Sequence, residues 1–480
     1  MKISFHGAAR TVTGSKHLVH LNNNKKILLD CGMFQGMGRD TVRLNNEWGF
    51  EPSQVTYVIL SHAHIDHVGL LPKLVKDGFN GKIFCTPGTA DLAKVLMMDS
   101  AHIQEMDVSR TNVWRSKEGK DPVHALYTEE DAIAAAALMH TLDINEVLEI
   151  DEDIQLMYTD CGHVLGAAAI HLTLQEDGKE VRLSFSGDIG RYRDVILRAP
   201  DPFPQADYII MESTYGDKLH DFLSASGDQL LKYIEQTCLE KGGKLIIPAF
   251  SVGRTQEILY LLNRLELERR LPDLDYYVDS PLSIDATAII KNHPECFNPQ
   301  VQEIMKKDDD VFDFKGLSFI GSAEESIALA DKKEPCVIIS SSGMAEAGRV
   351  KHHIANNVSD PRNTILIVGY CDPHSLGGKL RDGAAQVTIF GDTLEVNAAV
   401  GVISSMSAHG DYDDLLQWLS CQEKEQVKKI FLVHGEYSTQ TSFRERVLRK
   451  GYPEVIIPSM HEAVELAQEY VLEREERIVA

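Results

Sequence analysis

The sequence predicts an α/β fold in which one α/β domain is inserted into another. Helical and strand patterns alternate regularly from about residue 224 to residue 369, as they do in a parallel sheet with crossover helices. Strand patterns dominate before residue 60 and return after residue 393. A chain of 480 residues is also too long for one ordinary hydrophobic core, which favours two domains.

The N-terminal part begins with strands and continues into helices. Residues 1–60 alternate apolar and polar side chains around turn signals such as Asn22-Asn23-Asn24. Thr128-Glu129-Glu130-Asp131 resembles a capping box that opens an alanine-rich helix. The other elements expected here are helices near 67–77 and 88–106 and strands near 154–159, 168–174 and 181–187.

The inserted domain is expected to span 214–392. Its predicted elements are helix 224–240, strand 244–248, helix 253–266, strand 275–278, helix 283–291, and strands 336–340 and 364–369 with a helix between them. Strand patterns resume at 394–405, and the chain ends in a strongly acidic final helix. We therefore assign 1–213 and 393–480 to the outer domain.

The composition is that of a globular protein, with 43% hydrophobic and 25% charged residues. No apolar run reaches the roughly 18 residues of a membrane helix, and the N-terminus lacks an apolar signal core, so we expect a cytoplasmic protein without a membrane partner. The eight cysteines are scattered and form no Cys-x-x-Cys pair. The formal net charge of −24 opposes nucleic-acid binding, which depends largely on neutralising phosphates.

His62-Ala63-His64-Ile65-Asp66-His67 is the main candidate for a metal site. It follows the apolar run 55–60, which is expected to form a buried strand whose end can aim several side chains at one point. Histidine and aspartate are ligands that zinc and manganese prefer. The alternative is a polar loop that happens to be rich in histidine. Without a metal, however, four such side chains would be costly to desolvate together.

Four more ligand-type residues follow apolar strands elsewhere in the chain. They are Asp30, His163, Asp188 and His434. Each alone would more often be a satisfied buried polar group or a turn residue. Their shared position at a strand end, in most cases beside glycine, favours a role as ligands because glycine allows close approach of the backbone.

With these residues the sequence resembles the metallo-β-lactamase superfamily, whose His-x-His-x-Asp-His motif matches residues 62–67. It also resembles one branch, the β-CASP nucleases of RNA processing. Segments specific to that branch are Glu212-Ser213-Thr214-Tyr215-Gly216, Ser407-Ala408-His409-Gly410-Asp411-Tyr412 and Val433-His434-Gly435-Glu436. The resemblance covers the whole chain. It implies a metallo-β-lactamase αββα sandwich with an inserted parallel α/β β-CASP domain.

The resemblance also implies two divalent metal ions, with zinc expected and manganese as the alternative. Its implied ligand sets are His62, His64 and His163 for one ion, and Asp66, His67 and His434 for the other, with Asp188 bridging both. Asp66 would thereby belong to the catalytic centre. Asp30 would orient a ligand rather than bind metal.

A phosphodiester fits the expected charge of such a site. Two divalent ions bring about +4, and two aspartates with a hydroxide leave about +1, which a phosphodiester neutralises. In the family, a histidine at the position of His434 accompanies RNA rather than DNA as substrate. We therefore expect a metal-dependent ribonuclease. The sequence leaves open whether it acts as an endonuclease or as a 5′–3′ exonuclease, and which oligomeric state it adopts.

Glu212 and His409 form a second candidate pair. We expect Glu212 to accept a hydrogen bond from one nitrogen of His409, which would fix its tautomer and raise its pKa. His409 would then act as the general acid. The alternative is that His409 only caps the helix that begins near Asp411.

Two loops of the inserted domain are candidate phosphate-binding sites. Each lies between a strand and a helix, where backbone amides form an anion pocket. The candidate contacts are Ser342, Gly343, Arg349 and Lys351 in one loop and Arg254 in the other. Glycine and serine are also typical of any β–α turn, which is the alternative. The loop Cys371–Lys379 departs from the family pattern, so we assign no role to His374.

Two other functions remain open from the sequence. The first is another hydrolase on the same fold, such as a thioesterase or lactonase, although these lack the inserted domain. The second is an inactive scaffold subunit, although all seven expected ligand positions are occupied by ligand-type residues.

Overall fold

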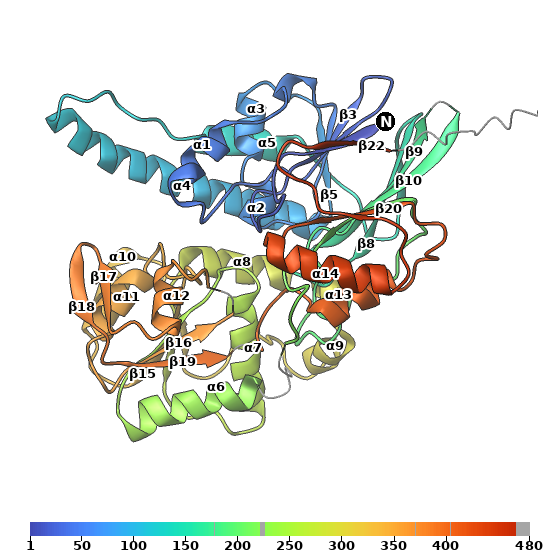
Figure 1. The fold of residues 1–480 in the computed structure, drawn as a ribbon. Helices are drawn as coiled ribbons and strands as arrows, with labels where there is room; N and C mark the ends of the chain where they lie inside the picture. Colours follow the sequence, from blue (N-terminus) through green and yellow to red (C-terminus); the bar gives the residue numbers. More distant parts are fainter. Residues whose placement is uncertain (177, 221–225, 370, 404, 467–480) are drawn as a thin grey trace, which may run out of the picture.

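The computed structural model describes residues 1–176, 178–220, 226–369, 371–403 and 405–466 (Figure 1). In this part of the chain, the outer domain contains two seven-stranded mixed sheets. The first has the order β22-β1-β2-β3-β4-β5-β6, with strands Ala463–Glu465, Lys2–Phe5, His17–His20, Lys26–Leu29, Tyr57–Ile59, Lys82–Cys85 and Met139–Thr141. The second has the order β21-β20-β11-β10-β9-β8-β7, with strands Val455–Ile456, Lys429–Val433, Tyr208–Glu212, Lys179–Phe185, Ala168–Glu176, Ile154–Asp160 and Val147–Asp151.

The two sheets pack face to face, and helices cover their outer faces. Phe5 and Phe431 meet between the sheets with ring centroids 5.2 Å apart. The first sheet carries α1 (Thr41–Asn46), α2 (Ile65–Val68), α3 (Leu71–Lys76), α4 (Pro87–Lys117) and α5 (Glu129–Ala137). The second carries α13 (Tyr412–Leu419) and α14 (Tyr437–Arg449), which bury Trp418 and Phe443. This is the predicted αββα sandwich.

The inserted domain is built on a six-stranded sheet in which every described pairing is parallel. The order is β14-β13-β15-β12-β16-β19, with strands Leu317–Phe319, Asp275–Val278, Cys336–Ser340, Leu245–Pro248, Thr364–Val368 and Ala399–Ile403. Its helices are α6 (Ser226–Ile234, continued by a π-helical turn Glu235–Glu240), α7 (Arg254–Leu267), α8 (Pro281–Lys291), α9 (Pro299–Met305), α10 (Ala323–Asp331), α11 (Val350–Asn357) and α12 (Leu376–Arg381). A hairpin, β17 (Gln386–Ile389) with β18 (Asp392–Glu395), lies beside them.

The sheet of the inserted domain extends past the expected boundary at 392/393. Strand β19 pairs in parallel with β16 from Thr364↔Ala399 to Val368↔Ile403, so residues 399–403 belong to the inserted domain. A strand pattern indicates that a segment is half buried, but not which sheet it joins, because pairing depends on residues far away in the chain. We therefore propose that the inserted domain extends to about residue 403.

Two helices also differ from the prediction. Helix α4 was expected near 88–106 but runs on to Lys117 and projects beyond the sandwich (Figure 1). Its last turns are exposed, so they carry no apolar periodicity to detect. The helix expected at 67–77 is divided at Gly69-Leu70 into α2 and α3. The predicted capping box at Thr128 is present, with both reciprocal hydrogen bonds to Asp131.

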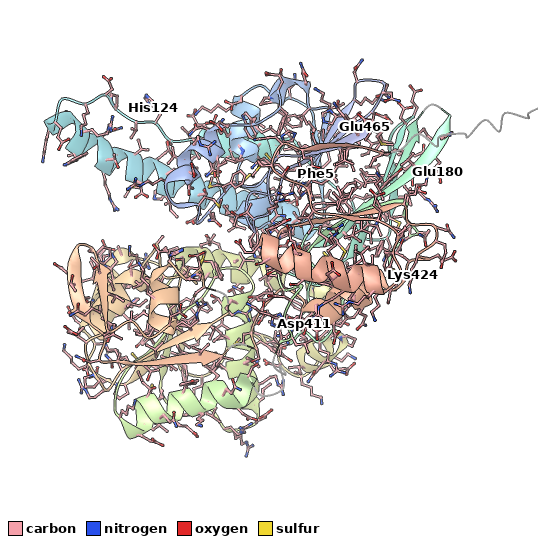
Figure 2. All side chains as sticks on the ribbon, in the orientation of Figure 1. Phe5, His124, Glu180, Asp411, Lys424 and Glu465 are labelled. Atoms are coloured by element: carbon pink, nitrogen blue, oxygen red, sulfur yellow. The ribbon has the colours of Figure 1, made fainter. Side chains whose placement is uncertain are left out.

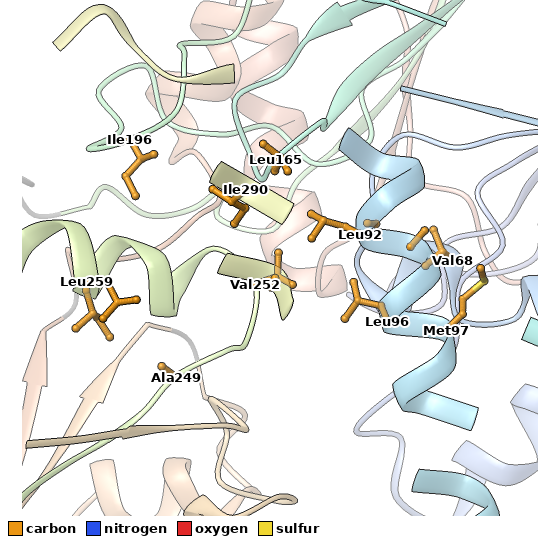
Figure 3. Close-up of a cluster of buried hydrophobic side chains, with 14 of the residues drawn as sticks. Val68, Leu92, Leu96, Met97, Leu165, Ile196, Ala249, Val252, Leu259 and Ile290 are labelled. Atoms are coloured by element: carbon orange, nitrogen blue, oxygen red, sulfur yellow. The ribbon is translucent and has the colours of Figure 1, made fainter. Parts of the chain in front are cut away.

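One apolar cluster joins the two domains. Leu92 and Leu96 of α4 lie beside Val252 and Ile290 of the inserted domain (Figure 3). Such a shared core resists separation of the domains, because opening it would expose apolar surface to water. Within the described ranges, no helix is long and apolar enough to cross a membrane. The predicted acidic final helix falls mostly in 467–480, outside the described residues.

Candidate metal centre

The ligand-type residues meet because strand ends of both sheets meet. Strands β3 and β4 are parallel, so Asp30 and the loop that begins at Ser61 leave the first sheet at the same edge. Strands β10, β11 and β20 are also parallel, and they end near Asp188, at Glu212 and before His434. The sandwich places these two edges together.

The first group of ligand atoms contains three imidazole nitrogens and one carboxylate oxygen. His64 Nδ1 lies 3.1 Å from His62 Nε2 and 3.2 Å from His163 Nε2. Asp188 Oδ2 lies 3.5 Å from both of these Nε2 atoms. All four ligand atoms lie within 4.8 Å of one another.

The second group shares Asp188 with the first. Asp188 Oδ1 lies 3.4 Å from His67 Nε2 and 3.6 Å from His434 Nε2. Asp66 Oδ2 completes the group at 3.4 Å from His434 Nε2. The two oxygens of Asp188 therefore face two separate sets of nitrogens, which is the arrangement expected of a carboxylate between two cations.

The donor set fits divalent metal ions in its spacing. Ligands at about 2.1 Å from a tetrahedral ion are about 3.4 Å apart, which agrees with the separations in both groups. Among the described residues, the buried atoms His67 Nε2 and Asp188 Oδ1 have no hydrogen-bond partner. Buried polar atoms without partners are costly, so their convergence indicates a ligand that these residues are built to hold.

The electrostatics of the three histidines in the first group fit the same role. Burial lowers the pKa of His62 and His163 well below the ordinary value, which keeps both rings neutral. Burial also lowers the pKa of His64 to about 4. A neutral imidazole is the form that binds a metal, so the site does not have to release protons from these rings.

Neighbouring side chains orient the ligands. Asp30 Oδ2 lies 2.6 Å from His67 Nδ1, which matches the expected orienting role, and Asp30 also accepts hydrogen bonds from the backbone and hydroxyl of Ser61. The Thr214 hydroxyl lies 2.9 Å from His434 Nδ1. The sequence analysis missed Ser61 and Thr214 as orienting residues. Ser61 directly precedes the histidine cluster and Thr214 lies in the Glu212 motif, and these positions could have indicated their role.

Glycine makes the approach of Asp188 possible. Gly187 has φ +55°, and a Cβ there would lie 2.4 Å from Ser61 Cβ. Any larger residue would therefore push the Asp188 strand away from the His62 loop. Asp30 and His434 are themselves in the left-handed region, at φ 57° and 49°. Such backbone strain in non-glycine residues is concentrated at functional sites.

The expected hydrogen bond between Glu212 and His409 is present. His409 Nδ1 lies 3.1 Å and 3.3 Å from the two Glu212 oxygens, and its Nε2 lies 3.9 Å from Asp188 Oδ2. Burial lowers the pKa of His409, but the Glu212 and Asp188 carboxylates outweigh this effect and raise it to about 9. The alternative role as a helix cap is wrong, because Asp411 caps α13.

The residues of the two expected phosphate-binding loops differ in how far their side chains are already bound to other residues. The Arg349 guanidinium donates to Asp279 at 2.7 Å and to the carbonyl oxygens of Ile320 and Gly321. Arg254 is buried and pairs with Glu257. Both arginines already donate hydrogen bonds to carboxyl groups inside the domain, so a phosphate would compete with these contacts and their phosphate-binding role stays a prediction.

The other predicted contacts occupy more open positions. Ser342 and Gly343 follow β15, and a Cβ on Gly343 would lie 2.5 Å from the Phe250 ring, so the two loops contact each other. Lys351 Nζ lies 5.3 Å from the centroid of Phe390, whose side chain is 58% exposed. His374 is exposed and is not part of either ligand group.

Comparison with protein-family models identifies three consecutive regions. Residues 17–215 match the metallo-beta-lactamase superfamily, 255–380 match the Beta-Casp domain, and 393–458 match the Zn-dependent metallo-hydrolase RNA specificity domain. The last match begins at the boundary that we expected from the sequence, although the sheet of the inserted domain continues to Ile403.

Curated relatives match over most of the chain. Ribonuclease TTHA0252 of Thermus thermophilus is 34% identical over 91% of this chain and 93% of its own length. The RNase J-like protein of Methanocaldococcus jannaschii is 32% identical over 92% of this chain and 94% of its own length. The transcription termination factor FttA of Methanosarcina mazei is 31% identical over 88% of this chain and 65% of its own length. With the site geometry and the order of domains, these matches show that the chain belongs to the β-CASP branch of the metallo-β-lactamase superfamily and is a divalent-metal hydrolase.

Proposed function

We propose that the protein is a two-metal ribonuclease that hydrolyses phosphodiester bonds of RNA during RNA processing or decay. One observation carries the proposal: Asp188 faces both groups of ligand atoms, and His409 lies beside it. The names of the relatives, a ribonuclease, an RNase J-like protein and a termination factor, support RNA as the substrate. A cytoplasmic location stays a prediction.

We infer that His62, His64 and His163 hold one ion, that Asp66, His67 and His434 hold the other, and that Asp188 binds both. Imidazole and carboxylate donors at tetrahedral spacing favour zinc, with manganese as the alternative. When bound, two such ions lower the pKa of water and stabilise negative charge on a phosphate.

The protein's own residues prepare the site for this chemistry. Asp30 and Thr214 fix the ring orientations of His67 and His434, and such contacts sustain metal affinity. Glu212 keeps a proton on His409 Nδ1 and favours the charged imidazolium. His409 Nε2 points towards Asp188, where it can protonate the leaving oxygen of the substrate.

We infer that RNA phosphates contact the backbone at Ser342 and Gly343 and the side chain of Lys351. With a formal net charge of −24, the protein must rely on local positive charge, so binding is expected to be weak and strongly salt-dependent.

The test is degradation of a 5′-labelled RNA by metal-loaded protein, with metal content measured on the same sample. Two ions per chain and time-dependent cleavage are expected. Internal fragments indicate an endonuclease, whereas immediate release of labelled mononucleotide indicates a 5′–3′ exonuclease. A thioester substrate assayed in parallel is the control for the fold: hydrolysis of the thioester with intact RNA would contradict the proposal. So would well under two ions per chain.

A further inference from the structure

The two segments that connect the domains lie side by side at His409. Residues 213–220 lead from β11 into the inserted domain, and residues 405–411 lead back from it to α13. Tyr412 N donates to the Lys218 carbonyl at 3.2 Å. His220 N donates to Asp411 Oδ2 at 3.0 Å. These contacts bind the outgoing segment to the returning one.

His220 makes the contact closest to the general acid. Its Nε2 lies 3.1 Å from the main-chain carbonyl oxygen of His409. A carbonyl oxygen only accepts, so His220 Nε2 must carry the proton and donate it. The ring of Tyr215 packs edge-on against His220, with centroids 4.6 Å apart, and fixes its plane.

The returning segment needs such a contact. Over 405–411, the described residues form neither helix nor strand, so no ladder of hydrogen bonds sets the direction of His409. Gly410 N donates to the Ile189 carbonyl at 2.7 Å, which holds one side of the peptide, and His220 holds the carbonyl on the other. Together they fix the main chain from which the His409 ring reaches Glu212.

We propose that His220 is a positioning residue for the reaction: by holding the His409 carbonyl, it keeps the His409 ring between Glu212 and Asp188. The inference rests on the proposed function, in which His409 is the general acid. It explains a polar contact that neither the metal ligands nor the Glu212–His409 pair requires. His220 itself is not a ligand and does not contact either ligand group.

The first test uses His220→Ala and His220→Gln, because a glutamine amide can place a donor near the position of Nε2. His220→Ala should lower kcat by about 10- to 100-fold, the scale of a misplaced catalytic group, with metal content and KM nearly unchanged. His220→Gln should recover most of the loss. The control is His124→Ala: His124 is exposed, lies in the loop after α4 and is far from Asp411 (Figure 2).

A double-mutant cycle separates positioning from a general structural effect. In a His409→Ala background, adding His220→Ala should lower kcat no further, because its effect acts through the missing ring. Losses that multiply would overturn the proposal, as would wild-type kcat in His220→Ala. Thermal unfolding of each variant shows whether the fold is retained.

NMR signals of the His409 ring, measured without substrate, test the positioning separately from ribonuclease activity. With ¹⁵N-histidine labelling, the His409 ring signals are identified by their loss in His409→Ala. They should shift in His220→Ala and stay in place in His220→Gln and His124→Ala. If the wild-type protein cleaves no RNA but the signals shift, the proposed function fails and the positioning stands. Unchanged signals in His220→Ala would overturn the positioning.

Discussion

Two buried aspartates, Asp188 in the outer domain and Asp279 in the inserted domain, follow strands of similar apolar character but have opposite surroundings. Asp279 accepts from Arg349 at 2.7 Å, from His353 at 2.6 Å and from Ser326 at 2.5 Å, so both of its oxygens are satisfied. Asp188 has histidine nitrogens at 3.4 to 3.6 Å, and its Oδ1 has no hydrogen-bond partner among the described residues.

The difference separates a structural polar cluster from a ligand site. A buried carboxylate that is saturated by hydrogen-bond donors stabilises one conformation of the chain and has no capacity left for a ligand. A buried carboxylate with an oxygen that has no hydrogen-bond donor keeps capacity for a ligand, and a cation can supply the missing partner. The distinction depends on the partners rather than on burial, which is nearly complete in both cases.

The largest effect is expected from Asp188→Ala. Loss of the carboxylate shared by both groups should reduce metal content towards zero and lower RNA hydrolysis by roughly 10³-fold or more, since the ligands act as one unit. Metal per chain is measured by elemental analysis beside the labelled-RNA assay. Two ions retained in this variant would contradict the bridging role. Asp279→Ala is the matched control, because its folded fraction should keep full metal content.

Asp279→Ala should instead act on stability. Removing the carboxylate leaves Arg349 without a counter-charge and the buried His353 without its hydrogen-bond partner, so the free energy of unfolding should fall by about 3 kcal/mol. Denaturant unfolding measures the change. Asp275→Ala, which breaks a more exposed pair with Lys332, should cost at most about 1 kcal/mol. Equal losses in the two variants would show that the Asp279 cluster has no special structural weight.

His409→Ala tests whether proximity to Asp188 makes a residue a ligand. His409 Nε2 is 3.9 Å from Asp188 Oδ2, whereas the nearest nitrogens of His62, His67, His163 and His434 lie 3.4 to 3.6 Å from an Asp188 oxygen. Metal content should therefore stay at the wild-type level, while kcat falls by about 10²-fold, the usual scale of acid catalysis. Loss of metal in this variant would assign His409 to the ligands.

The smallest effect is expected from Glu212→Gln. Glu212 resembles Asp279 in being saturated by donors, namely Ile189 N, Thr214 N and His409. Removing its charge should lower the pKa of His409, because burial disfavours the imidazolium and one opposing carboxylate is lost. The fall of kcat on the alkaline side should move to lower pH, with a loss of about tenfold at pH 8 and less at pH 6. A pH–kcat profile that matches the wild type would contradict this coupling.

The fold was predictable where the hydrophobic periodicity was clear and turn residues separated the elements. The alternation across 224–369 predicted a parallel sheet, and strands β12, β13, β15 and β16 lie within two residues of the expected ranges. The sequence was less informative where a strand pattern is compatible with more than one sheet, or where an exposed helix has no apolar pattern. The strand pattern of residues 399–403 does not indicate which sheet they join, and the exposed end of α4 lacks an apolar stripe.

At the site, the same division holds. Residue type and position after a strand drew attention to the ligand candidates and to Asp30, because metal binding needs few side-chain types. The family resemblance marked the ligand sets and the Glu212–His409 pair. For Arg254 and Arg349 the phosphate-binding role stays a prediction, because a positive charge in a glycine-rich loop looks the same in sequence whether it meets a phosphate or a carboxyl group of the domain.

The sequence by itself determined which side chains could bind a cation and that most of them would follow apolar strands. Only the tertiary structure decided how they combine: that the two oxygens of Asp188 face different nitrogens, that Asp279 is already saturated, and that His220 reaches the carbonyl of His409 across two connecting segments. The physical reason is the distance along the chain over which each property is set. Strand propensity and ligand chemistry are local properties, whereas hydrogen-bond saturation depends on residues that lie far apart in the chain and meet only on folding.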